Sequence, residues 1–111
     1  MSKKYLRKNE FRFNLNSEHF GKEKQPHPAY ITARYGHKYR ANSITHSRTV
    51  NGVKNLNIYE NPNLRSKDKR FTRVSPPYWQ SDKQFSEDTI PYFRFSKKAR
   101  RKISKYNKKF K

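Results

Sequence analysis

The chain has 111 residues and a formal net charge of +20, and only 31% of its residues are hydrophobic. A chain of this length forms one domain and has no room for a second hydrophobic core. Low hydropathy with high charge places it near the border of intrinsic disorder, and its self-repulsion favours a polyanionic partner. Composition therefore indicates nucleic acid as the first partner class, with an anionic membrane surface as the less favoured one.

Cysteine is absent from the chain. A disulfide framework, a thiolate zinc site and a cysteine nucleophile are therefore excluded, and a reducing compartment is favoured. No apolar segment follows the basic N-terminal residues, so we expect no signal peptide. No stretch approaches the roughly 18 apolar residues of a membrane span. We expect a cytoplasmic protein.

Residues 1–26 are predicted to form a basic N-terminal arm and linker, mobile over about its first ten residues. Phe11, Phe13 and Leu15 alternate with polar residues, which is the period of a half-buried strand. A docked extended segment fits this short run equally well. Glycine and proline among charged residues then predict a loop up to residue 28.

The clearest β-hairpin begins at residue 29. Alternation over residues 29–35 divides the side chains between two faces. One face has Ala29, Ile31, Ala33 and Tyr35, and the other has Tyr30, Thr32 and Arg34. Gly36 and His37 supply the turn, and the chain returns through residues 39–44. Because Ile31 and Ala33 are apolar, we expect their face to point inward and Tyr30 and Arg34 to lie on the surface.

Further short strands follow the hairpin. Asn51-Gly52 is the strongest turn signal in the chain. Residues 56–59 alternate until an Asn-Pro-Asn turn ends them, and residues 71–74 form a last short strand before two prolines. The pattern predicts a mainly β fold over residues 27–80, either a small antiparallel curled sheet or a barrel.

Residues 81–111 are predicted to form an acidic loop followed by a basic C-terminal helix. Three of the eight acidic residues lie within residues 81–89. Ser96 is the expected N-cap, and residues 97–109 contain no glycine or proline. The apolar side of this helix is expected to contain Ala99, Ile103, Tyr106 and Phe110. Before this segment, Tyr78-Trp79 either closes one end of the core or stands exposed.

The C-terminal helix has an unusual charge pattern. Nine of the fifteen residues from Lys97 to Lys111 are basic and none is acidic. Solvated helices usually mix charges to gain i,i+4 pairs, and like charges at this spacing repel. Either the helix contacts phosphates, or it is a solvated basic tail. Aromatic residues interleaved with basic ones elsewhere favour base stacking, although they also fill a core that is poor in aliphatic side chains.

The basic residues of both ends and of the hairpin are therefore the predicted nucleic-acid contacts. With one aromatic residue, they are Lys3, Lys4, Arg7, Lys8, Tyr30, Arg34, Lys38, Arg40, Arg73, Lys97, Lys98, Arg100, Arg101, Lys102, Lys105, Lys108 and Lys109.

Four histidines occur without metal-ligand spacing, so we expect no metal site and no cofactor. His46 and Arg48, with two hydroxyls beside the histidine, form the one candidate catalytic pair, because ribonuclease chemistry needs a base and a cation that stabilises phosphate charge. The alternative is a polar turn in which the hydroxyls of Thr45 and Ser47 cap backbone groups.

Several short stretches carry a family resemblance, and they read His27-Pro-Ala-Tyr-Ile31, Ile44-Thr-His-Ser47, Gly52-Val-Lys-Asn-Leu56, Asn61-Pro-Asn63 and Asp68-Lys-Arg70. Residues 27–75 resemble small, basic, uncharacterised proteins of Gram-positive bacteria and their mobile elements. The resemblance implies a bacterial or mobile-element setting and supplies no catalytic residues. A compact barrel would also be similar in architecture to PemK/MazF-type ribonuclease toxins, without matching motifs.

The leading hypothesis is an RNA- or DNA-binding accessory protein that contacts phosphates through basic arms, with RNA preferred because aromatic residues suit unstacked bases. The sequence favours a non-enzymatic protein over an enzyme. A larger nucleoprotein complex is a further partner to consider. One alternative is a small endoribonuclease toxin. Another is a protein-binding inhibitor module that uses a basic face.

Overall fold

The structure is a computed structural model, and it describes residues 10–16, 26–66 and 72–110. The described elements are β1 (Phe11–Asn14), β2 (His27–Tyr35), β3 (Lys38–Thr45), β4 (Thr49–Val50), β5 (Val53–Lys54), β6 (Leu56–Asn57), β7 (Arg73–Val74), β8 (Tyr78–Ser81), a short 3₁₀ helix (Asp82–Gln84) and α1 (Lys97–Asn107). The prediction of a mainly β fold with a C-terminal helix is confirmed.

The long strand β3 is the centre of an antiparallel sheet. It pairs with β2 along one edge, and with β8 and then β7 along the other. The path runs β1-β2-β3-β7-β6, and β4 and β5 form a separate small hairpin. Within the described residues no pairing joins β6 to β1. The sheet is therefore open, and of the two predicted alternatives the barrel is wrong.

Local turn chemistry explains both predicted hairpins. Gly36 joins β2 to β3 with φ at 58°, and Asn51 and Gly52 join β4 to β5 with φ at 48° and 79°. Two consecutive positive φ values are what a type I′ hairpin turn requires, and asparagine and glycine adopt them most readily. These turn predictions are confirmed.

The expected alternation along β2 breaks at a β-bulge. Ile31 is opposite Ala41, but Ala33 is opposite Arg40, so Thr32 is the extra residue and the register shifts there. A bulge moves the residues after it to the opposite face from the one that alternation predicts. Ile31 and Ala33 consequently lie on different faces, and the prediction that both point inward is wrong.

Two apolar clusters cover the two faces of the sheet. The larger one includes Phe11, Tyr30, Phe95 and Ile103, and the smaller one includes Ile31 with Phe85. The larger cluster thus joins β1, β2 and α1, so the core extends across the predicted segment boundaries at residues 26/27 and 80/81. Tyr30 is only 9% exposed, because Phe11 and Phe95 pack on its ring with centroids 5.2 and 5.1 Å away.

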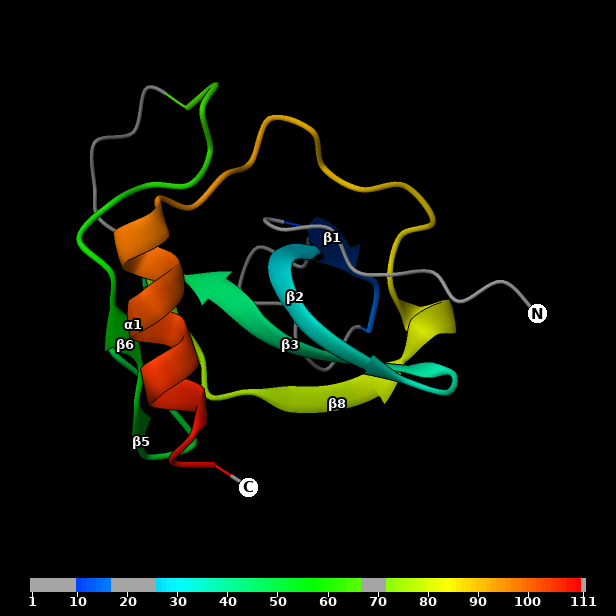
Figure 1. The fold of residues 1–111 in the computed structure, drawn as a ribbon, viewed down its shortest axis with the longest axis horizontal. Coiled ribbons are helices and arrows are strands. Elements are labelled where there is room, and N and C mark those ends of the chain that lie inside the picture. The colour runs from blue at the N-terminus through cyan, green and yellow to red at the C-terminus, as the bar shows by residue number, and fades with distance from the viewer. Residues whose placement is uncertain (1–9, 17–25, 67–71, 111) are drawn as a thin grey trace.

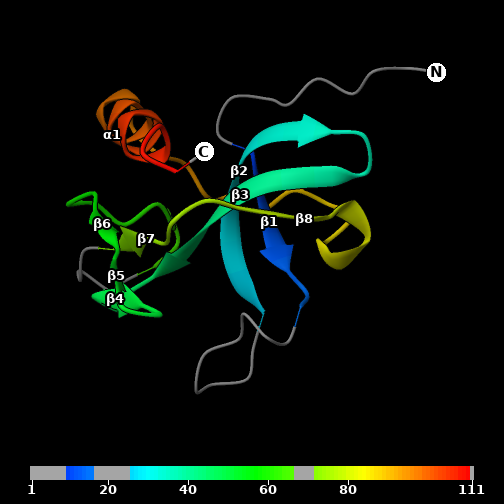
Figure 2. The same ribbon diagram turned by 90° about the horizontal axis from the view of Figure 1, so that it is seen from below.

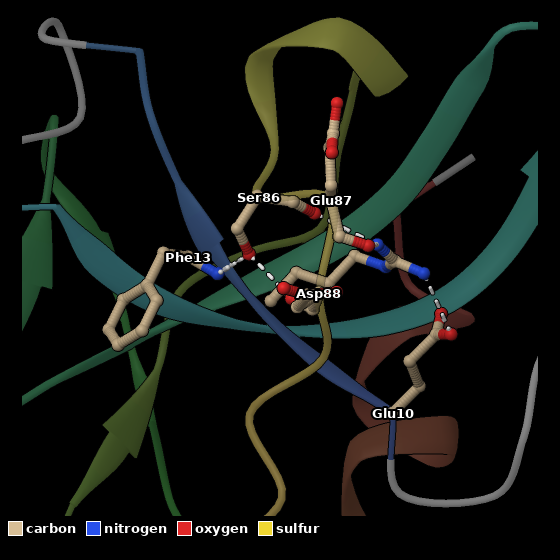
Figure 3. A network of polar contacts seen from close by, with 6 residues as sticks. Glu10, Phe13, Ser86, Glu87 and Asp88 are labelled. Carbon is tan, nitrogen blue, oxygen red and sulfur yellow. Dashed lines mark hydrogen bonds and ion pairs between the residues drawn. The ribbon is translucent and has the colours of Figure 1, made fainter.

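The acidic loop after the 3₁₀ helix is tied to β1 (Figure 3). Arg12 donates to the backbone oxygens of Ser86 and Glu87, and its other nitrogen lies 3.3 Å from the carboxylate of Glu10. Ser86 Oγ in turn accepts from the backbone N–H of Phe13 at 2.9 Å. These contacts fix the acidic residues of the loop beside β1.

Helix α1 packs on the face of the sheet that contains the larger cluster, next to β5 and β6 in Figure 1. Ser96 caps it as predicted, since Ser96 Oγ accepts from the backbone N–H of Ala99 at 3.1 Å. Its fully buried residues are Ala99, Ile103 and Asn107, spaced four apart. The predicted apolar side is therefore partly wrong, because Tyr106 and Phe110 are only half-buried and an asparagine occupies the last buried position.

Candidate nucleic-acid interface

A groove of about 860 Å³ runs between α1 and the segment from β5 to β7. Six of its lining residues are cationic and two are tyrosines, and no described lining residue is acidic. They are Arg48, Lys54, Arg73, Lys102, Lys105, Lys109, Tyr59 and Tyr106. We call this surface the basic groove.

One wall of the basic groove is a flank of α1. Lys102, Lys105 and Lys109 are spaced three and four residues apart, so a helix places them in one row. The burial of Ala99 and Ile103 fixes the rotation of the helix about its axis. The row of ammonium groups is therefore held toward the groove by packing on the opposite side of the helix.

The other wall comes from the sheet and the β4–β5 hairpin. Arg73 in β7 donates to the backbone oxygen of His46 at 3.1 Å, which holds its guanidinium near the turn after β3. Tyr106 of α1 donates its hydroxyl to the backbone oxygen of Lys54 at 2.8 Å, and burial raises the pKa of this tyrosine. This bond joins the two walls and sets the width of the groove.

An exposed aromatic ring lies at the edge of the basic groove. Tyr59 is 61% exposed and has a positive φ of 56°. Lys102 Nζ lies 4.7 Å from the centre of its ring, which is a cation–π contact. A positive φ is uncommon for an aromatic residue, and here it places the ring beside the lysine row rather than in the core.

The charges of the described residues are segregated. The segment with Asp82, Glu87 and Asp88 lies at the far end of the molecule from α1 and the β4–β5 hairpin in both views (Figures 1 and 2). Glu60 is nearer to α1, but its carboxylate accepts from the backbone N–H and the hydroxyl of Ser96. The carboxylate of Glu60 keeps its charge, but it is one negative charge against the six cations of the basic groove, so the potential there stays positive.

A second, smaller groove of about 440 Å³ lies on the other flank of α1, against β2. Arg40, Arg100 and Lys108 line it, and no described lining residue is acidic. Arg100 Nε is buried without a hydrogen-bond partner. Both flanks of the helix thus present cations to solvent-filled grooves.

The structure brings together only some of the predicted contact residues. Lys102, Lys105, Lys109 and Arg73 meet in the basic groove, and Arg100, Arg40 and Lys108 meet in the smaller one. The remaining helix cations line neither groove, and these are Lys97, Lys98 and Arg101. Lys38 is exposed at the start of β3. The predicted arm contacts Lys3, Lys4, Arg7 and Lys8 lie outside the described residues.

Three predicted hairpin contacts have structural partners instead. Tyr30 is buried in the larger cluster, so the prediction that it lies on the surface is wrong. Arg34 lies 3.5 Å from the carboxylate of Asp82. Arg40 donates to the backbone oxygens of Asn107 and Phe110, at 3.3 and 2.6 Å, and so holds the C-terminal end of α1.

The turn that contains His46 has the hydrogen bonding of a polar turn, which was the alternative to a catalytic site. The backbone N–H of Ser47 donates to Thr45 Oγ1 at 3.0 Å, which is the hydroxyl capping expected of a polar turn. His46 is exposed, and Arg48 lines the basic groove. A catalytic role for this pair stays a prediction. Among the described residues no group of three histidine or acidic side chains is placed to hold a metal ion.

Four of the cationic and tyrosine residues of the basic groove were not predicted as nucleic-acid contacts. Arg48 was predicted only as part of a catalytic pair and Tyr106 only as part of the apolar side of the helix, and the other two had no predicted site role. Lys54 lies two positions after the Asn51-Gly52 turn, and Tyr59 follows a strand of only two residues. Neither belongs to a charge run, and the stretch Gly52–Leu56, which contains Lys54, carries only the family resemblance and no site role. The one signal in the sequence was the Asn51-Gly52 turn, which places Lys54 on the returning strand of a hairpin. That this hairpin faces α1 across the groove depends on the tertiary fold.

No family model, curated protein or solved structure matches the chain. The resemblance of residues 27–75 to small basic bacterial proteins stays a prediction. In the described part of the chain, no helix is long and apolar enough to cross a membrane.

Proposed function

We propose that the protein is a non-enzymatic nucleic-acid-binding accessory protein, with RNA preferred, and that the basic groove is its phosphate-binding surface. One observation carries the proposal. Six cations from α1, β5, β7 and the turn between β3 and β4 line a single groove, and no described residue of its lining is acidic. Isolated cations on a surface are usually solvated, but cations held in two facing walls with no carboxylate between them repel one another until an anion binds.

Phosphate contacts account for most sequence-independent affinity for nucleic acid. Lysines on a helix flank facing one arginine on a strand and one in a turn match a nucleic-acid backbone that carries one charge per nucleotide. Tyr59 and Tyr106 add aromatic surface to the groove, which suits unstacked bases and supports RNA over duplex DNA. In this proposal Lys3, Lys4, Arg7 and Lys8 supply further phosphate contacts.

The test compares two charge-matched variants in binding to a labelled single-stranded RNA. The groove variant carries Lys102→Gln, Lys105→Gln and Lys109→Gln, and the control carries Lys83→Gln, Lys97→Gln and Lys98→Gln, none of which lines the basic groove. Each loses three charges, and glutamine keeps the helix propensity of lysine. We expect the groove variant to bind at least about tenfold more weakly than the control.

Equal affinity of the two variants would place binding elsewhere. A wild-type complex from cell extract that survives nuclease treatment and contains only protein would instead support a protein-binding module.

A further inference from the structure

Two large aromatic side chains stand exposed on one face of the sheet, beyond the end of α1. Tyr35 at the end of β2 is 82% exposed, and Trp79 in β8 is 50% exposed. Scattered exposed aromatics are common on protein surfaces and need no explanation. The exposure of Tyr35 and Trp79 does need an explanation, because the strand register places both side chains on the same face of the sheet.

The register shows this directly. Tyr35 is opposite Lys38, and Trp79 is opposite Arg40, and both partners belong to β3 two positions apart. Residues opposite each other share a face, as do residues i and i+2 on one strand. The bulge at Thr32 is what moves Tyr35 to this face. Because β2 and β8 flank β3 and the two partners are two residues apart along it, the backbone positions of the two aromatic residues are about 12 Å apart.

This face adjoins the smaller groove along α1. Arg40 borders both, since it pairs with Trp79 and also lines the groove with Arg100 and Lys108. The carboxylate of Asp82, the nearest acidic group in the sequence, lies 3.5 Å from Arg34. Arg34 is opposite Tyr39, and therefore on the other face of the sheet. The aromatic pair thus has Lys38 and Arg40 opposite it, and the carboxylate of Asp82 is paired with an arginine on the other face of the sheet.

We infer that the open face of the β2–β3–β8 sheet stacks unpaired bases of a single-stranded nucleic acid on Tyr35 and Trp79, while Arg100 and Lys108 in the adjoining groove contact its phosphates. The inference rests on the proposed function and adds to it a preference for single strands. In a duplex the base faces are already stacked on one another, so only an unpaired strand can present them to protein rings. An aromatic platform beside a cationic groove is the combination that such strands require.

Trp79 itself reports on the inference, because it is the only tryptophan in the chain. The full chain is titrated with three unlabelled ligands, and tryptophan emission is followed. The ligands are a single-stranded oligonucleotide, the same oligonucleotide with abasic residues throughout, and the corresponding duplex. We expect saturable quenching with the first ligand only, since a stacked base quenches the indole and a bare backbone does not.

Affinity is measured in parallel by anisotropy with labelled forms of the three ligands. Tyr35→Ala should weaken single-strand binding about fivefold or more and leave abasic binding unchanged, because one lost stacking contact is worth roughly that factor. The matched control is Leu64→Ala, which removes another exposed side chain, 65% exposed and outside both grooves. Tyr35 is so exposed that its truncation should leave the fold intact.

The outcomes separate the two proposals. If the oligonucleotides bind but Trp79 emission is unchanged and abasic and normal strands bind equally, the stacking inference is overturned and the proposed function stands. If none of the three ligands binds, both fail. If emission changes with protein concentration alone, a second copy of the chain occupies the face and the inference is overturned.

Discussion

Asn42 of β3 and Asn107 of α1 form a reciprocal amide pair in the interior. Nδ2 of Asn42 donates to Oδ1 of Asn107 at 2.8 Å, and Nδ2 of Asn107 donates back at 2.9 Å. Both side chains are buried, and Asn42 also donates to the backbone oxygen of Ser75 at 2.8 Å. The pair fixes the position of the helix along β3, and with it the position of the lysine row.

Asn107→Ala should therefore destabilise the protein by about 2–3 kcal/mol, because it removes two buried hydrogen bonds and leaves Asn42 Oδ1 without its partner. Urea denaturation of the variant and the parent measures the difference. Ser104→Ala, at an exposed position of the same helix, is the control and should change stability by less than about 0.5 kcal/mol. A loss for Asn107→Ala as small as that of the control would show that the pair does not hold the helix.

Arg40 should matter for stability and not only for binding. Arg40→Gln removes the donor to the oxygens of Asn107 and Phe110 and a positive charge from the C-terminal end of α1, which should cost about 1–2 kcal/mol. Thermal unfolding checks this in the absence of nucleic acid. Lys38→Gln, on the same face but exposed, should be nearly neutral. If both variants are neutral, Arg40 is free to serve as a binding residue alone.

Alkaline pH should weaken the fold. Burial raises the pKa of Tyr30 and of Tyr78 above the ordinary value of 10.0. A pKa that is higher in the folded state means that their contribution is fully present below the unfolded value and is lost as pH rises through the folded value. The free energy of unfolding should therefore fall above about pH 10.

Tyr30→Phe tests this pH dependence, because it removes the ionisable hydroxyl and keeps the ring packing. The variant should lose less stability than the parent between about pH 9 and pH 11, measured by urea denaturation at each pH. Tyr35→Phe is the exposed control and should follow the parent curve. Parallel curves for Tyr30→Phe and the parent would contradict the burial argument.

The parts of the fold that follow from local chemistry could be predicted from the sequence. Asn51 and Gly52 identify their turn, and Ser96 identifies the start of the helix, because a positive φ and an N-cap depend on one or two residues. Strand β8 was not predicted, since it has only four residues and its pairing with β3 is a tertiary contact. The bulge at Thr32 has no signal in its neighbours either.

The candidate site likewise has a part that the sequence predicts and a part that depends on tertiary contacts. The concentration of cations in the C-terminal helix is visible in the sequence, but which of them face a groove depends on the rotation of the helix. Ala99, Ile103 and Asn107 together fix that rotation, and a polar residue such as Asn107 at a helix end does not indicate burial until its partner, Asn42, is known. Tyr30 does lie on the face opposite Ile31, as alternation predicts, but it is buried because the larger cluster covers that face as well, and this packing is a tertiary contact.

The salt dependence of affinity for single-stranded RNA tests the central claim most directly. The slope of log affinity against log salt, measured between about 50 and 200 mM for the wild type, the groove variant and the charge-matched control, counts the phosphates that each one neutralises. We predict that replacing Lys102, Lys105 and Lys109 reduces the slope by about 2, and that replacing Lys83, Lys97 and Lys98 leaves it nearly unchanged. Equal slopes for the two variants, or an affinity of the wild type that does not vary with salt, would contradict the assignment of the basic groove as the phosphate-binding surface.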